Sequence, residues 1–406
     1  MIVLIIYVII CSLFTPVFKK KYGFFANPHN LFILFWSICA SLSVINLNNL
    51  RDVDIKVHVY GIVFLFTYCV VSRISLIDGN RVKVNNEYVL NLKKINVKIA
   101  IVELLALTLY YQYFFQACTA LIAGDVQSIR TAYYSSERSF FTLTVPETVL
   151  WAVMFVEVFL YHKTKKIRYL INSILLVGVI TITSLGRWAL LYFIIENAII
   201  VIMVEHKIKL SSKPVLIGIG SIIAVTIIGR NSDLIESFIT YFTGSFSFLD
   251  YIVSHPNDYG LDKLHYGIIT LSPITEPLLY FLKVIGATTE KIPSYWLNEN
   301  IQEFVDIGNA SRIALYNNNA TALLPFLLDF GPVGIPIGAS FIAILSAIFF
   351  KGYLQGKPIY VLLFLLATTS LFTTTMSYQS YMGITPCVFF LVFYFIMHDN
   401  NKYHFK

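Results

Sequence analysis

The chain has 406 residues, of which 57% are hydrophobic and only 13% are charged, and its formal net charge at pH 7 is +7. Soluble domains carry about 25% charged residues, so this composition excludes an ordinary soluble protein and predicts a chain that crosses a membrane many times. The positive charge fits loops that orient such a chain, and it does not indicate a nucleic-acid surface.

About eleven segments are long and apolar enough for a membrane span, which needs roughly 20 residues. We therefore predict an all-α polytopic membrane protein with about eleven transmembrane helices, within a range of about ten to thirteen. The expected parts are N-terminal transmembrane helices in residues 1–230, a large structured external loop with interfacial helices in residues 231–320, and C-terminal transmembrane helices in residues 321–406. The expected spans are residues 1–18, 31–48, 59–77, 98–123, 144–162, 169–185, 188–205, 214–229, 325–350, 358–377 and 382–397.

Charge in the connecting loops predicts the orientation of the chain. The first apolar run has no basic residue before it, and Lys19–Lys21 follow it, so we expect an uncleaved anchor with its N-terminus outside. One alternating set of loops holds 19 Lys and Arg residues and the other set holds 10. Cytoplasmic loops are the richer in these residues, which predicts a cytoplasmic C-terminus and an external long loop.

The long loop contains two apolar stretches of its own. Residues 232–255 place apolar and aromatic side chains at mixed helical spacing. Residues 266–286 are interrupted by Pro273 and Pro277 and carry Glu276 and Lys283. These interruptions favour an interfacial or re-entrant piece over a full span.

The five cysteines predict neither a disulfide framework nor a metal site. All lie inside apolar runs and none forms a CxxC pair, so they are expected to be small buried hydrophobic residues. The sequence also lacks HExxH spacing. We expect no cofactor and no metal. The cysteines are Cys11, Cys39, Cys69, Cys118 and Cys387.

Two arginines stand at predicted outer helix ends, each directly after a glycine: Arg187 in TSLGRWALL and Arg230 in IIGRNSD. A charge at such a place is costly unless it meets water, a partner or an anionic substrate. The planar guanidinium matches phosphate oxygens in two-point contacts, which suits a pyrophosphate. Alternatively, each arginine extends to lipid head groups.

Two histidines in the external loop are candidate general bases. His255 and His265 lie ten positions apart, with Asp258 and Asp262 between them. Imidazole or carboxylate can take the proton of an attacking sugar hydroxyl. Their spacing matches no metal-binding motif.

The exit from the long loop carries further polar candidates. Asn318 and Thr321 are suited to hydrogen bonds with sugar hydroxyls, and Arg312 could be a third phosphate ligand or a partner of Asp329. Asp329 lies about one turn inside an apolar run, where either a packing role or a functional one fits.

Three acidic residues fall inside predicted spans: Glu103, Glu157 and Glu196. They sit in different spans and spacing gives none of them a partner, so we expect mainly structural roles. An ion or proton path is the alternative.

The order of these features resembles the Wzy-type O-antigen polymerases, the repeat-unit polymerases of bacterial surface polysaccharides. The similarity of topology covers nearly the whole chain, and D-F-G-x-x-G at the loop exit is its most specific local part. An odd number of spans departs from the twelve-span plan of that family. The matching residues are Gly186, Arg187, Gly229, Arg230, Asn318, Thr321, Pro325, Phe326, Asp329, Phe330, Gly331 and Gly334.

The resemblance implies a GT-C-like helical bundle and a metal-independent glycosyltransferase at the outer face of the bacterial cytoplasmic membrane. Such an enzyme would join undecaprenyl-pyrophosphate-linked oligosaccharides into O-antigen or a capsule-type polysaccharide. Arg187 and Arg230 would bind pyrophosphate, and His255 or His265 would be the base. Membrane lipids, a chain-length regulator and a flippase are the implied partners.

Two other functions fit the same features. An O-antigen ligase-like glycosyltransferase keeps the chemistry and changes the acceptor to the lipid A core. A lipid-linked oligosaccharide transporter would also be polytopic, basic and aromatic, although it would not need a long external loop flanked by arginines.

Overall fold

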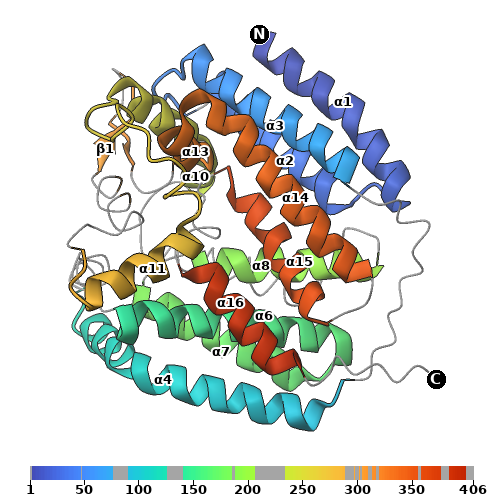
Figure 1. Ribbon diagram of the computed structural model, residues 1–406, viewed down its shortest axis with the longest axis vertical. Helices are drawn as coiled ribbons and strands as arrows, with labels where there is room; N and C mark the ends of the chain where they lie inside the picture. The colour runs from blue at the N-terminus through green and yellow to red at the C-terminus, as the bar shows by residue number, and fades with distance from the viewer. Residues whose placement is uncertain are drawn as a thin grey trace. The chain divides into compact units, whose positions relative to one another are not determined.

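A computed structural model gives the arrangement of most of the chain (Figure 1). It divides into two compact units, each assembled from separate stretches of sequence. Unit 1 comprises Met1–Val82, Ser232–Lys351 and Ser370–Pro386, and unit 2 comprises Lys83–Asn231, Gly352–Thr369 and Cys387–Lys406. The structure describes residues 2–46, 48–75, 90–125, 140–184, 188–205, 234–288, 297, 301, 304–309, 313–316, 320–354, 358–375 and 384–398.

Six helical stretches among the described residues are long and apolar enough to cross a membrane. Each coincides with a predicted span, which supports the all-α polytopic membrane class. Shorter apolar helices at Tyr192–Val201, Pro358–Thr373 and Thr385–Met397 fall in three further predicted spans. The total of eleven spans stays a prediction. The six stretches are Ile2–Tyr22, Pro28–Ile45, Ile55–Ser75, Thr142–Thr164, Ile167–Ser184 and Leu323–Tyr353.

In unit 1, α1 (Ile2–Tyr22) packs against α2 (Pro28–Ile45) and α3 (Ile55–Ser75), and α10 (Leu234–Ser254) packs against α2 and α3. Local sequence sets the bounds of α2. The side chain of Asn27 accepts a hydrogen bond from the amide of Asn30, and Pro28 occupies the first helical position. Asn46 ends the helix in the left-handed conformation.

Aromatic side chains form the core between α2, α3 and α10. The ring centroid of Trp36 lies 4.8 Å from that of Phe64 and 5.8 Å from that of Phe246. All three side chains are fully buried. Rings in such arrangements add favourable electrostatics to the burial of their large apolar surfaces, so this core fixes α10 against the two early helices.

The rest of unit 1 consists of short elements followed by one long helix. They are α11 (Ser272–Val284), an antiparallel pair of strands β1 (Val305–Asp306) and β2 (Leu315–Tyr316), α13 (Leu323–Phe330), a 3₁₀ turn η3 (Gly331–Val333) and α14 (Gly334–Leu354), whose last residues belong to unit 2. At 13 residues, α11 is too short for a span. Its exposed Ile274, Leu278 and Phe281 form one apolar stripe, as an interfacial helix requires.

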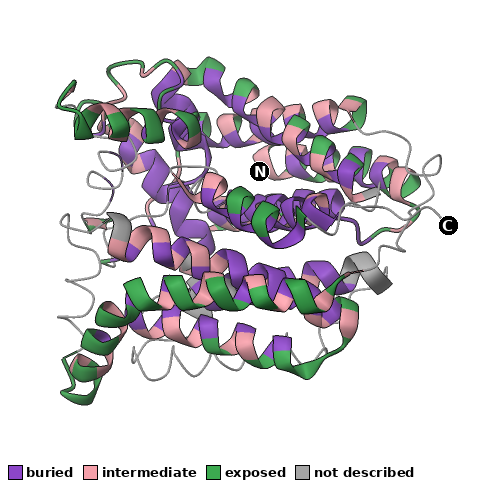
Figure 2. Cartoon of the chain, turned by 60° about the horizontal axis from the view of Figure 1, so that its bottom comes forward, coloured by how far each residue is buried: buried purple, intermediate pink, exposed green. Residues whose placement is uncertain are grey.

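Unit 2 is built around α6 (Val145–Thr164), which packs against α4 (Leu92–Ile122), α7 (Ile167–Ser184) and α8 (Trp188–Glu205). Every residue from Ala152 to Leu160 is buried. Figure 2 shows other helices with buried residues along one side and exposed residues along another. A π-helical turn η2 (Phe140–Thr144) precedes α6, and most of α15 (Pro358–Thr373) and of α16 (Thr385–Met397) belongs to this unit.

Candidate functional site

An ion pair in unit 1 joins the connection between α2 and α3 to the end of α10. The Nε atom of Arg51 lies 3.0 Å from Oδ2 of Asp250, and an Nη2 hydrogen of Arg51 is donated to Oγ of Ser254 at 3.1 Å. The guanidinium carbon lies 5.7 Å from the ring centroid of Tyr251. We call Arg51, Asp250, Tyr251, Ser254 and His255 the Arg51 cluster.

The buried carboxylate of Asp250 organises this cluster. Besides the ion pair, its Oδ1 accepts a hydrogen bond from the amide of Asp54 at 3.0 Å. Its side chain is only 5% exposed, whereas that of Arg51 is 36% exposed. Without Arg51, the buried Asp250 carboxylate would carry an uncompensated charge. The ion pair therefore keeps the Arg51 guanidinium at this place on the surface.

His255 extends the cluster beyond the last residue of α10. Its ring stacks on Tyr251 with centroids 4.3 Å apart and planes 27° apart. Its Nδ1 lies 2.8 Å from the carbonyl oxygen of Tyr251. A carbonyl oxygen can only accept, so Nδ1 carries the hydrogen, and in the neutral ring Nε2 carries the lone pair. This is the tautomer that a base acting through Nε2 requires.

Arg51 and His255 therefore contact the same tyrosine ring with complementary chemistry. Arg51 commits two of its five N–H donors to Asp250 and Ser254, which leaves donors for an anionic group. His255 offers a lone pair for a proton. A cation beside a base can bind an anionic molecule and deprotonate a hydroxyl close to it.

The side chains of Asp329 and Thr321 accept hydrogen bonds from backbone amides. Both side chains are fully buried. The Asp329 carboxylate accepts hydrogen bonds from the amides of Ile269 and Thr270 at 3.1 and 2.5 Å. Thr321 Oγ1 accepts from the amide of Leu323 at the start of α13. Of the two roles left open for Asp329, these contacts favour packing.

The backbone of His265 contacts α13, the helix that carries Asp329. Its amide donates to the carbonyl of Leu328 at 3.0 Å, and the amide of Tyr266 donates to the carbonyl of Asp329 at 3.0 Å. The two candidate histidines thus belong to different surroundings, His255 to the Arg51 cluster and His265 to α13.

The D-F-G-x-x-G residues form the junction between α13 and α14. Gly331 has φ +61° and ψ −153°, a combination that glycine alone adopts readily. A Cβ at Gly334 would overlap the carbonyl of Phe326. These backbone constraints and the hydrogen bonds of Asp329 account for the D-F-G-x-x-G residues as structural requirements of the junction between α13 and α14.

Four predicted site residues, Arg187, Arg230, Arg312 and Asn318, lie outside the described residues. Their proposed contacts with pyrophosphate and sugar stay predictions. Within the described part of the chain, no group of three or more His, Cys, Asp or Glu side chains could hold a metal ion.

Sequence reasoning missed Arg51, which it had counted only as a loop charge. Its hydrogen-bond partner Ser254 is 203 positions away, and no local spacing reveals such a pair. Spacing gave Glu103 and Glu157 no partner, and the structure supplies one, because both carboxylates accept hydrogen bonds from the amide of Asn172. A polar Asn172 inside an apolar run was the available signal.

Comparison of the chain with protein-family models, with curated proteins and with solved structures gives no match.

Proposed function

We propose that this protein is a metal-independent glycosyltransferase. It joins undecaprenyl-pyrophosphate-linked oligosaccharide repeat units into a surface polysaccharide at the outer face of a bacterial cytoplasmic membrane. The multi-span helical architecture supports a lipid-linked substrate. The proposal assigns His255 as the base and Arg51 as a cation that helps to bind the anionic part of a substrate.

In the proposed reaction, a hydroxyl oxygen of the acceptor sugar attacks the anomeric carbon of the donor. The bond from that carbon to the pyrophosphate oxygen breaks, and its electron pair leaves with undecaprenyl pyrophosphate. The hydroxyl proton passes to Nε2 of His255. Guanidinium groups stabilise the charge that grows on the departing oxygen, a role that the proposal gives to Arg187 and Arg230.

The observation that carries the proposal is the hydrogen bond between Nδ1 of His255 and the carbonyl of Tyr251. It fixes the ring so that Nε2 is the basic atom, beside an ion-paired Arg51 that contacts the same Tyr251 ring. The Arg51 cluster is also built from residues 49–58 and residues 231–320. The Lys and Arg content of the loops predicts that both segments lie on the outer side of the membrane.

The test measures the chain length of surface glycan in a strain that lacks this protein and carries single variants. His255→Ala should reduce polymer about 100-fold or more, because a general base contributes about that much. Arg51→Lys should restore part of the polymer that Arg51→Ala removes, since lysine keeps the charge and loses the fork.

Lys263→Ala removes an exposed cation from the same loop and is the matched control, expected to keep the normal ladder. Normal ladders in His255→Ala, with equal protein in the membrane, would remove His255 from the mechanism. The deletion separates the three functions: loss of a polymerase leaves single repeat units on the acceptor, loss of a ligase leaves none, and loss of a transporter traps units inside.

A further inference from the structure

Five exposed basic residues gather at one end of unit 2, where α4 begins, α6 ends and α7 begins. The hydroxyl of Tyr169 donates to Oδ1 of Asn96 at 2.8 Å and so joins the beginnings of α4 and α7. None of the five forms an ion pair within the described part of the chain. We call these residues the basic end: Lys93, Lys94, Lys165, Lys166 and Arg168.

The neighbouring sequence supplies no negative charge to balance the basic end. Residues 90–102 and 158–172 contain no Asp or Glu. Lys98 adds a further positive charge, although its Nζ already donates to the carbonyl of Phe395 at 2.8 Å. Like charges on one surface repel one another, so this end of unit 2 attracts an anion.

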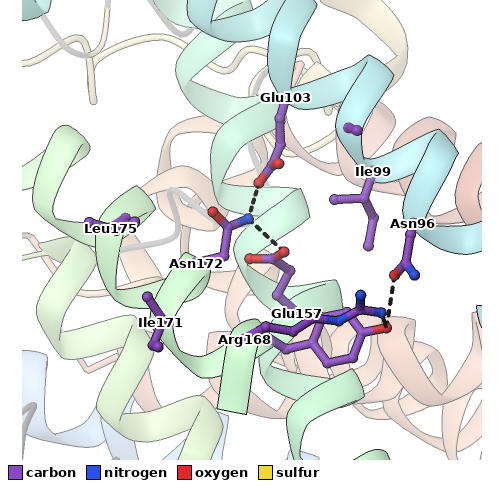
Figure 3. Close-up of a pocket in the computed structure, with 10 residues that line it drawn as sticks. Asn96, Ile99, Glu103, Glu157, Arg168, Ile171, Asn172 and Leu175 are labelled. Carbon is purple, nitrogen blue, oxygen red and sulfur yellow. Dashed lines mark hydrogen bonds between the residues drawn. The ribbon is translucent and has the colours of Figure 1, made fainter. Parts of the chain in front are cut away.

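A pocket of about 380 Å³ lies beside the basic end, between α4, α6 and α7 (Figure 3). Sites for small molecules have volumes of about 300–1,000 Å³. The wall of this pocket is mainly apolar, and its Ile171 and Leu175 are 52% and 61% exposed. They lie on α7, a helix of membrane-spanning length, so lipid acyl chains suit this wall.

Arg168 connects the two features, because it belongs to the basic end and also lines the pocket. Its Nη2 donates to the hydroxyl of Tyr169 at 2.8 Å, and its guanidinium carbon lies 4.6 Å from the centroid of that ring. These contacts orient the guanidinium and use one of its five N–H donors. Arg168 lies in the first turn of α7, near the level of lipid phosphates, and its remaining donors can meet two phosphate oxygens.

The polar side chains elsewhere in the pocket leave Arg168 to a ligand. The amide nitrogen of Asn172 donates to Oε1 of Glu103 at 2.5 Å and to Oε1 of Glu157 at 2.6 Å. Figure 3 shows the Glu103 carboxylate directed toward Asn172 and lying apart from Arg168. An anionic group in this pocket therefore belongs at the Arg168 end, away from the two carboxylates.

We infer that the basic end binds an anionic phospholipid. The lipid phosphate pairs with Arg168, the head group lies among the four lysines, and one acyl chain occupies the apolar pocket beside Ile171 and Leu175. This binding site is independent of glycosyl transfer.

The charge of the basic end favours an anionic lipid over a zwitterionic one. Both classes carry a phosphodiester that can pair with Arg168. In a choline lipid the trimethylammonium group would lie among the four lysines and be repelled, whereas an anionic head group brings no positive charge. The pocket favours a lipid over a free phosphate, because only a lipid has an acyl chain to cover Ile171 and Leu175.

The test titrates purified full-length protein in detergent with phosphatidylglycerol or phosphatidylcholine of identical acyl chains and follows the first bound lipid by native mass spectrometry. Phosphatidylglycerol should bind about tenfold more tightly or better, because each Lys or Arg near an anionic head group contributes about fivefold. Equal affinities would overturn the inference. Displacement of the lipid by an equal concentration of inorganic phosphate would also overturn it and indicate a site for a free anion.

Arg168→Ala should lower the preference for phosphatidylglycerol about fivefold. Arg73→Ala is the matched control, since Arg73 is an exposed arginine in the last turn of α3 and does not line the pocket; it should keep the preference. An equal fall in both variants would assign the preference to overall charge and overturn the site. On the natural protein, added salt should shrink the preference because exposed charges are screened, and an unchanged preference would contradict the role of the basic end.

Discussion

At the scale of single residues, this protein uses charged side chains to hold backbone segments outside its spans. Asp306 is exposed, and its Oδ1 accepts hydrogen bonds from the amides of Ala314 at 2.8 Å and Gly308 at 2.9 Å. These hydrogen bonds, that of Ala314 foremost, hold the pKa of Asp306 below its ordinary value of 3.8. The carboxylate therefore stabilises the turn between β1 and β2 mainly in its charged form.

A carboxyl group whose pKa is lower in the folded protein than in the unfolded chain stabilises the fold at any pH above its unfolded-state pKa. This stabilisation is lost as the pH falls through the folded-state pKa. Asp306→Asn keeps an acceptor oxygen and removes the titration. We expect the Ala314 amide of the natural protein to exchange more slowly than that of the variant at about pH 6, with the difference vanishing as pH falls below about 4. The rate ratio at each pH cancels the intrinsic pH dependence of exchange, and a constant ratio would contradict the prediction.

At the scale of elements, the junction between α13 and α14 depends on one backbone conformation. A Cβ at Gly331 would meet Leu264 Cδ2 at 3.7 Å, an ordinary contact, so Gly331→Ala introduces backbone strain without a steric clash. We expect a loss of about 1–3 kcal/mol in the free energy of unfolding. The measurement is unfolding of purified protein in mixed micelles.

The matched control is Gly178→Ala in α7, where a Cβ would have no atom within 4 Å. Alanine is the better helix former, so this variant should be neutral or more stable by up to about 1 kcal/mol. A Gly331→Ala variant as stable as the natural protein would show that the junction tolerates a side chain at this conformation.

The same junction shows which parts of a site the sequence predicts. The motif around Asp329 could be located because it is contiguous. The sequence did not reveal the role of Asp329, because its hydrogen-bond donors are backbone amides 59 and 60 positions away. Every residue type except proline has such an amide, so no residue type marks the donor. The pairing of Arg51 with Asp250 was missed for a related reason, since only the packing of α10 on α2 and α3 brings them together.

At the scale of the whole molecule, the spans were the most predictable feature because hydropathy is a local property. Six predicted spans coincide with helices of membrane length within a few residues. The differences arise at caps, as at Asn27 and Pro28, where α2 begins before its apolar run does. The grouping of helices into two discontinuous units depends on side-chain contacts between distant segments, which hydropathy does not encode.

The loop charges predict the orientation in the membrane, and this prediction has a direct test. In a variant whose five cysteines are replaced by alanine, Lys263→Cys places a thiol on an exposed residue of the long loop. Lys166→Cys places one on the exposed connection between α6 and α7. Because the loop around Lys166 belongs to the set richer in Lys and Arg, we expect it to face the cytoplasm.

A membrane-impermeant thiol reagent should therefore label Lys263→Cys in intact cells and label Lys166→Cys only after permeabilisation. The reverse pattern would place the Arg51 cluster on the cytoplasmic side, where it could not act on repeat units at the outer face. Labelling of both thiols in intact cells would show that the two segments share one side, which an even number of spans between residues 166 and 263 would require. The reverse pattern would remove the proposed polymerase, whereas labelling of both thiols would keep the Arg51 cluster outside and contradict only the predicted side of residue 166.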